Sequence, residues 1–194
     1  MIDHPSRLPD ADVDPLFPGR WSPRSFAPDP IPRPQLLALF EAARWAPSAR
    51  NEQPWRFLYA DTPETLALFR LLLVDSNRAW ADRAPVLVFV LARRHFLHNG
   101  RPNPTAAFDT GAAWMALALQ ARLLGLHTHP MAGIHHDQAY ETLGVPRDDF
   151  ELLAAVAIGH LAPPDLLPPD LRAREVPSSR LALASIATPG PFSA

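Results

Sequence analysis

The placement of proline constrains this chain more than any other feature of its sequence. Prolines make up 24 of the 194 residues, about 12% against an average near 5%, and they gather toward both ends. Proline blocks helix interiors, so residues 1–33 and 161–194 are predicted to be coil. A chain of this length suits one domain. The sequence therefore predicts a single domain over residues 1–194, with extended arms or tails at 1–18 and 182–194.

The middle of the chain alternates helical and strand patterns. A continuous apolar run with β-branched residues is typical of a strand buried on both faces, and two such runs occur. Periodic segments with hydroxyl, proline or glycine boundaries predict helices. The predicted strands are 55–59, 86–92, 127–131 and 152–158, and the predicted helices are 34–46, 63–74, 105–124 and 137–143. Thr62 is the predicted cap of the second helix and Asp137 that of the last. This alternation predicts a layered α/β or α+β domain.

The ends of the chain also suggest a partner and a location. The two arms contain few apolar residues of their own, so they are most stable when they wrap another surface, and we expect a homodimer. The longest apolar stretches are far too short to span a bilayer, and the first 18 residues lack the pattern of a signal peptide. We therefore expect no membrane association and a cytoplasmic protein.

Composition excludes several kinds of chemistry. The chain has no cysteine, and all 18 of its basic residues are arginine. Thiolate nucleophiles, thiolate metal sites, Schiff-base lysines and the P-loop lysine are therefore excluded. The net charge of −2 without long charge runs argues against nucleic-acid binding. Neither a dinucleotide fingerprint nor a Gly-x-Ser-x-Gly motif is present.

A group of histidines is the first candidate site. His127 and His129 share one face of a predicted strand, and His135 and His136 follow closely. Two or three imidazoles can bind a metal ion, but no carboxylate stands at a suitable spacing. Exposed histidines in a loop after a strand are the favoured interpretation, so no metal site is predicted.

Two further segments carry stronger signals. In Arg20-Trp21-Ser22-Pro23-Arg24-Ser25-Phe26, arginines flank a serine, which suits a phosphate or an electron-rich ring. In Ala46-Pro47-Ser48-Ala49-Arg50-Asn51-Glu52-Gln53-Pro54-Trp55, a helix stops at proline and carboxamides follow that could read the edge of a flat ring. Taken alone, the first segment is more often a solvated basic loop and the second an ordinary turn.

Together the two segments resemble the N-terminal signatures of the nitroreductase family of flavoproteins. The resemblance continues through residues 109–125, 130–133 and 158–159 to Arg180, and so spans roughly residues 18–181. It implies an α+β fold with three layers, in which helices flank a central mixed, mostly antiparallel sheet. It also implies terminal arms exchanged in a homodimer, with FMN bound at the subunit interface and NAD(P)H as electron donor.

The resemblance further implies roles for individual residues. Arg20 and Ser22, with Trp21 between them, would face the phosphate and ribityl chain, Arg180 would close on the phosphate, and Arg24 would reach the flavin's pyrimidine edge. From the other subunit, the turn that contains Gln53 would contact the flavin. No catalytic side chain is implied, because flavin N5 carries the hydride. The implied cofactor-binding residues are Arg20, Trp21, Ser22, Arg24, Pro47, Ser48, Ala49, Asn51, Gln53, Asn77, Pro130, Met131, Ala132, Gly133 and Arg180.

Departures from the family pattern shape the expected activity. Trp80 and Ser178 stand at two places where many members have lysine, and Ala132 stands where some have glutamate. The resemblance implies NAD(P)H-driven, ping-pong reduction of nitroaromatics, quinones or similar flat, electron-poor molecules. The alternatives are other flavin chemistry within the family (heterocycle dehydrogenation, dehalogenation or flavin breakdown), or a flavin- or metal-binding protein without turnover. The loop at 93–104 would either cover the pocket or be an ordinary surface loop.

Overall fold

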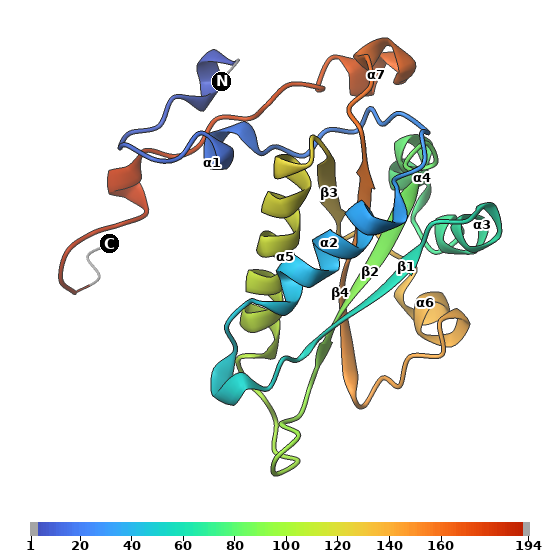
Figure 1. Ribbon diagram of the computed structural model, residues 1–194, viewed down its shortest axis with the longest axis vertical. Helices are drawn as coiled ribbons and strands as arrows, with labels where there is room; N and C mark the ends of the chain where they lie inside the picture. Colours follow the sequence, from blue (N-terminus) through green and yellow to red (C-terminus); the bar gives the residue numbers. More distant parts are fainter. Residues whose placement is uncertain (1–3, 192–194) are drawn as a thin grey trace.

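A computed structural model describes residues 4–191 of the chain (Figure 1). Its middle is an α+β body, as predicted from the resemblance, and every predicted strand is present. The strands are β1 (Trp55–Ala60), β2 (Val86–Arg93), β3 (His127–Met131) and β4 (Phe150–Gly159). The α-helices are α1 (Leu16–Gly19), α2 (Arg33–Arg44), α3 (Pro63–Arg70), α4 (Asp75–Ala81), α5 (Ala106–Leu123), α6 (His136–Thr142) and α7 (Pro169–Arg172), and the 3-10 turns are η1 (Pro5–Arg7), η2 (Ala49–Asn51), η3 (Pro164–Leu166) and η4 (Leu183–Ser185).

The four strands form one sheet in the order β1-β2-β4-β3. All three pairings are antiparallel, with a register shift in β2 between Val90 and Leu91. The sheet within this chain is therefore antiparallel throughout the described residues. A short isolated bridge between Phe26 and Leu161 attaches the first arginine-bearing segment to the residues just after β4.

The alternation of side chains along β2 explains the three layers. Val86, Val88 and Val90 belong to an apolar cluster with residues of α2 and α5, whereas Leu87 and Phe89 belong to a second cluster with residues of α3 and α4. Successive side chains of a strand point to opposite faces, so a fully apolar strand must be covered on both. In Figure 1, α2 and α5 lie over one face of the sheet, and α3, α4 and α6 lie on the other.

The long helix α5 packs chiefly on α2 and on the sheet. Its buried positions carry small side chains such as Ala113, Ala118 and Ala121, which permit the close approach of backbones. It ends just before Gly125, whose φ of +76° is the left-handed conformation typical of a helix C-cap. The 18 residues of α5 extend roughly 27 Å, a length that separates the two parts of the candidate site.

The structure corrects several boundaries. The helix predicted at 63–74 begins as expected with Thr62 as its cap, but it ends at Arg70. The separate helix α4 follows, which sequence analysis missed. The helix predicted from Asp137 begins at His136, so Asp137 lies inside its first turn and His135 is the N-cap. Parts of the predicted coil at both ends form short helical turns, α1 and α7 among them. Four-residue helices that contain or follow proline are too short for the interior clash that proline causes.

The two terminal segments run beside each other, away from the layered body (Figure 1). Their exposed apolar side chains include Leu8, Phe17, Leu181 and Ile186. No helix among the described residues is long and apolar enough to cross a membrane.

Candidate functional site

A cavity of about 300 Å³ gathers most of the arginines that sequence analysis singled out. We call it the anion pocket. Its walls come from three parts of the chain: the segment after α1, the strand β3, and the C-terminal tail. It is lined by Arg20, Trp21, Ser22, Arg24, His129, Arg174, Val176, Ser178 and Arg180. The predicted residues Arg20 through Arg24 and Arg180 therefore meet in one place, although 160 residues of sequence separate the first from the last.

The positive charge of the anion pocket is not paired with carboxylates of the described residues. Within residues 4–191, no salt bridge joins Arg20, Arg24 or Arg180 to a carboxylate. Burial lowers the pKa of Arg20, and the charges of Arg180, Arg7 and Arg122 lower it further. Like charges held together in a partly desolvated space favour an anion between them, and guanidinium forks suit phosphate oxygens.

One carboxylate stands beside this pocket, but its hydrogen bonds go to backbone. Oε1 of Glu175 accepts hydrogen bonds from the backbone N–H groups of Arg24 and Ser25, at 2.7 and 2.8 Å. The Ser25 hydroxyl donates to the carbonyl of Pro163, 2.7 Å away. These contacts fix the backbone on which Arg24 stands and leave its guanidinium free for a ligand.

The histidine pair on β3 is buried or half-buried, so the prediction of exposed histidines was wrong for His127 and His129. Nδ1 of His129 lies 2.8 Å from the carbonyl oxygen of Pro23, to which it donates, and its ring packs on Trp80 with centroids 4.4 Å apart. His127 accepts a hydrogen bond from Arg122 at 3.0 Å. Burial lowers the pKa of each histidine to about 4, so both rings are neutral at pH 7.

No metal centre accompanies these rings. Across residues 4–191, no three side chains of His, Cys, Asp or Glu lie close enough to hold a metal ion. His135 and His136, by contrast with the buried pair, are exposed. The imidazoles of β3 therefore serve as packing and hydrogen-bonding groups, and that of His129 lies in the wall of the anion pocket.

Asn77 and the segment 130–133 meet directly. The Asn77 amide donates to the carbonyl of Gly133 at 3.1 Å, which fixes its orientation. A Cβ at Gly133 would lie 2.5 Å from Nδ2 of Asn77 and 2.7 Å from Cγ2 of Val74, so any larger residue would displace these side chains. Met131 points into the core, whereas Pro130 and Ala132 are exposed. A ligand beside this segment would meet backbone, proline and alanine, and not the methionine side chain.

The turn at residues 47–53 is the strained part of the site. Arg50, Asn51 and Gln53 have φ angles of 53°, 57° and 48°, a left-handed conformation that costs about 1–2 kcal/mol for each non-glycine residue. The hydrogen bonds that hold the turn include those from the Gln53 N–H to the Ser48 hydroxyl at 3.0 Å and from the Ala49 N–H to the buried Asp109 at 3.1 Å. Strain that the surroundings maintain is characteristic of functional sites.

This strained turn does not join the anion pocket within the chain. It lies beside the beginning of α5 through Asp109, whereas Trp21 packs on His127, just after the end of α5. Figure 1 shows η2 and α1 at opposite ends of α5. Asn51 and Gln53 line a separate, open cavity of about 460 Å³ with Leu97 and His98. One chain thus presents two partial sites separated by the length of a helix.

Several pocket residues escaped sequence analysis. Arg174 and Val176 line the anion pocket and Glu175 orients its backbone, but the C-terminal tail has no periodic pattern or motif that marks them. His129 was noticed only as a possible metal ligand. Their proximity to Arg20 comes from the path of the tail, a property of tertiary structure that spacing along the sequence does not encode.

Comparisons with known proteins agree with this geometry. The family model described as "Nitroreductase family" matches residues 18–76 and 69–160. A Streptomyces coelicolor protein whose name places it among NADH dehydrogenase/NAD(P)H nitroreductases is 31% identical over 185 residues, covering 81% of this chain and 87% of the relative. A Lactiplantibacillus plantarum protein named CLA biosynthesis enone reductase is 26% identical, over 84% of this chain and 91% of its own length.

A solved structure is more similar still. A crystal structure described as an oxidoreductase containing FMN is 48% identical, covers 100% of this chain and 99% of its own, and superposes with a TM-score of 0.94. The family model spans well over half of the described residues. On these matches the chain belongs to the nitroreductase family.

Proposed function

We propose that this protein is an FMN-dependent oxidoreductase that uses NAD(P)H to reduce flat, electron-poor molecules. The observation that carries the proposal is the anion pocket, where three predicted arginines converge without a carboxylate partner in the described chain. The 48% identical structure described as containing FMN supports the same cofactor here. Guanidinium and hydroxyl groups around a small cavity fit a phosphate, so the residues present fit FMN.

Each segment described above is proposed to contact a different part of the cofactor. Arg20, Ser22 and Arg180 would hold the phosphate and ribityl chain, with Trp21 beside them. Arg24 would place positive charge at the pyrimidine edge, and Asn77 would offer its amide there. Pro130, Ala132 and Gly133 would lie beside the ring, with Met131 contributing only its backbone. Bound FMN would supply the two-electron redox chemistry that no side chain of this chain provides.

The strained turn is assigned to a second copy of the chain. Pro47, Ser48, Ala49, Asn51 and Gln53 are assigned to the cofactor by their match to the family signature. The turn lies beside Asp109 at the beginning of α5, whereas Trp21, next to Arg20, packs on His127 beyond the end of that helix, which supports two different subunits for the two groups. We propose a homodimer in which each subunit offers this turn to the other's anion pocket, with the terminal arms reaching onto the partner.

Exposed Pro130 and Ala132 are consistent with an open face beside the flavin ring. Donor and oxidant would use the same open face in turn, so the kinetics would be ping-pong. We assign no general acid or base among the side chains, because the neutral, buried imidazoles of His127 and His129 already use ring nitrogens for internal hydrogen bonds. Nitroaromatics and quinones are the proposed oxidants, and the similarity to an enone reductase adds conjugated enones. A cytoplasmic location stays a prediction.

An absorption spectrum of the purified protein tests the proposal. We expect a flavin spectrum that bleaches when NADH or NADPH is added without oxygen and returns when a quinone, nitroaromatic or enone is supplied. Parallel lines in double-reciprocal plots would support ping-pong kinetics. A colourless protein that also fails to take up added FMN would overturn the proposal.

A further inference from the structure

The C-terminal tail that carries Arg180 has few attachments to the body of the protein. Within the described chain, three hydrogen bonds join residues 176–186 to other segments, and all three reach residues 6–10. The Ser6 hydroxyl donates to the Pro177 carbonyl at 2.8 Å, and the Asp10 carboxylate accepts from the Leu183 N–H at 2.6 Å. The third is the guanidinium of Arg7, which donates to the Ser178 carbonyl at 2.8 Å.

Arg7 is the centre of this junction. It is only 7% exposed, yet no carboxylate among the described residues pairs with it. Its guanidinium instead donates to three carbonyls, those of Pro18 at 2.9 Å, Ser178 at 2.8 Å and Arg20. A planar guanidinium with five donors can hold several acceptors at fixed angles, which a lysine ammonium cannot match. One side chain thus ties the backbone of Arg20 to the backbone two residues before Arg180.

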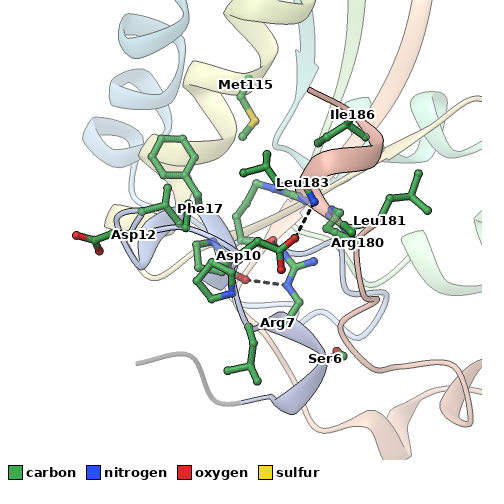
Figure 2. Close-up of a pocket in the computed structure, with 17 residues that line it drawn as sticks. Ser6, Arg7, Asp10, Asp12, Phe17, Met115, Arg180, Leu181, Leu183 and Ile186 are labelled. Carbon is green, nitrogen blue, oxygen red and sulfur yellow. Dashed lines mark hydrogen bonds between the residues drawn. The ribbon is translucent and has the colours of Figure 1, made fainter. Parts of the chain in front are cut away.

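Figure 2 shows the space that these segments enclose. The N-terminal segment and the tail frame a cavity of about 620 Å³, with Arg7, Asp10, Arg180 and Leu183 around it and Met115 of α5 at its far side. Arg20 and Arg180 line both this cavity and the anion pocket. The two cavities therefore adjoin at Arg20 and Arg180.

We propose that residues 6–10 form a clasp, with Arg7 as a positioning residue, that holds Arg180 beside Arg20 and so completes the phosphate site. The inference rests on the proposed function, since it assigns the phosphate of FMN as the ligand. It goes beyond the family assignment, because the matched family model begins at residue 18 and ends at residue 160. Both the clasp and the tail that it holds lie outside that range.

The test compares FMN with riboflavin, which lacks the phosphate, as ligands of the full-length protein freed of bound flavin. In Arg7→Gln, we expect FMN affinity to fall by about tenfold or more, as the loss of charge-assisted hydrogen bonds would cause, while riboflavin affinity changes little. Arg7→Lys keeps the charge but not the fork, and it should lose nearly as much. Arg83→Gln, which removes an exposed arginine, is the control and should bind FMN normally.

Two further measurements separate positioning from a general loss of stability. If Arg7 acts through Arg180, Arg7→Gln combined with Arg180→Gln should bind FMN no more weakly than Arg180→Gln alone. Trypsin should cleave the ligand-free tail after Arg180 faster in Arg7→Gln than in the wild type. If Arg7→Gln does not fold, Asp10→Asn weakens the same clasp from an exposed position and should show the same changes to a smaller degree.

Each adverse outcome overturns a different statement. Equal losses of FMN and riboflavin affinity, or fully additive losses in the double variant, would overturn positioning through Arg180. Unchanged cleavage of the tail would overturn the clasp itself. A wild-type protein that binds no FMN would overturn the proposed function, whereas the cleavage experiment would still decide whether the clasp exists.

Discussion

The side-chain amide of Asn77 donates to the main-chain carbonyl of Gly133, and a single added carbon at Gly133 would collide with that amide. The two residues come from α4 and from the segment after β3, 56 positions apart. Their contact joins the residue proposed for the pyrimidine edge to the backbone proposed to lie beside the ring.

Gly133→Ala should destabilise the protein by about 1–3 kcal/mol, as overpacking typically does, and should weaken flavin binding because Asn77 must move. Chemical unfolding and flavin titration measure the two effects. Gly111→Ala is the matched control, since nothing lies within 4 Å of a Cβ there and alanine favours a helix. Equal behaviour of the two variants would contradict the proposed role of close packing at Gly133.

Arg24→Ala should weaken FMN binding and make the reduction potential of the bound flavin more negative. A positive charge near the ring favours its anionic reduced form, so its loss should cost roughly 30 mV, which is about 1.4 kcal/mol for a two-electron couple. Spectroelectrochemistry measures the potential, with Arg83→Gln as the control for lost charge. An unchanged potential in a fully occupied Arg24→Ala protein would remove Arg24 from the pyrimidine edge.

Stability should fall as the pH drops below about 6.5. The folded-state pKa of His127 and of His129 is about 4, whereas an unfolded histidine titrates near 6.5. Between these values the unfolded chain binds more protons, so the stabilisation is fully present above 6.5 and is lost progressively down to about 4, at up to roughly 1.4 kcal/mol per pH unit for each ring.

Urea unfolding at a series of pH values checks this slope. His129→Asn retains a donor for the Pro23 carbonyl but cannot titrate, and it should flatten the dependence. His136→Asn removes an exposed histidine and should leave the slope as it is. A slope that does not respond to His129→Asn would argue against a buried, neutral ring at this position.

Two substitutions in the strained turn should distinguish effects on stability from effects on cofactor binding. Arg50→Gly and Asn51→Gly each place glycine at a positive φ, so both should relieve strain, by up to about 1 kcal/mol after glycine's entropic cost. Only Asn51 is assigned to the flavin, so only Asn51→Gly should lower flavin retention. Thermal unfolding and flavin content distinguish the two variants. Equal retention in both would remove Asn51 from the site.

Mixing two defective proteins tests the shared site. Arg24→Ala and Asn51→Ala alter opposite halves of each proposed site, so a mixed dimer would combine both defects in one site and leave the other site intact. We expect part of the flavin binding and NAD(P)H oxidation to return when the two variants are refolded together. Mixtures that stay as inactive as their components would contradict a site built from two chains.

The sequence was sufficient for the layers and for part of the site, and the reasons are physical. The apolar run at 86–92 must be covered on both faces, which already implies helices on each side. Segments 20–26 and 46–55 were singled out because together they match a family signature, although neither segment alone indicates a site. The break between α3 and α4 was not predictable, because 66–74 is apolar except for Arg70 and contains neither proline nor glycine. Tertiary contacts of Leu72 and Leu73 with the segment after β3 replace the helical pattern there.

Contacts between residues far apart in the sequence were the other part that could not be predicted. Arg7 lies in a proline-rich stretch without any motif, and its partners lie 11, 13 and 171 positions away. His127 and His129 were read as exposed because alternation along a short strand does not reveal that Trp21 and Trp80 will cover them.

The alternation along β2 has a consequence for how this protein tolerates change. Val88 and Phe89 are neighbours in sequence, yet one packs toward α2 and α5 and the other toward α3 and α4. A substitution at Val88 would thus disturb the layer that contains α5, which lies between the two partial sites. A substitution at Phe89 would disturb the layer that contains α4 and therefore Asn77. Neighbouring residues of β2 are therefore constrained by different helices during evolution. Substitutions at Val86, Val88 and Val90 should vary together with residues of α2 and α5, and those at Leu87 and Phe89 with residues of α3 and α4.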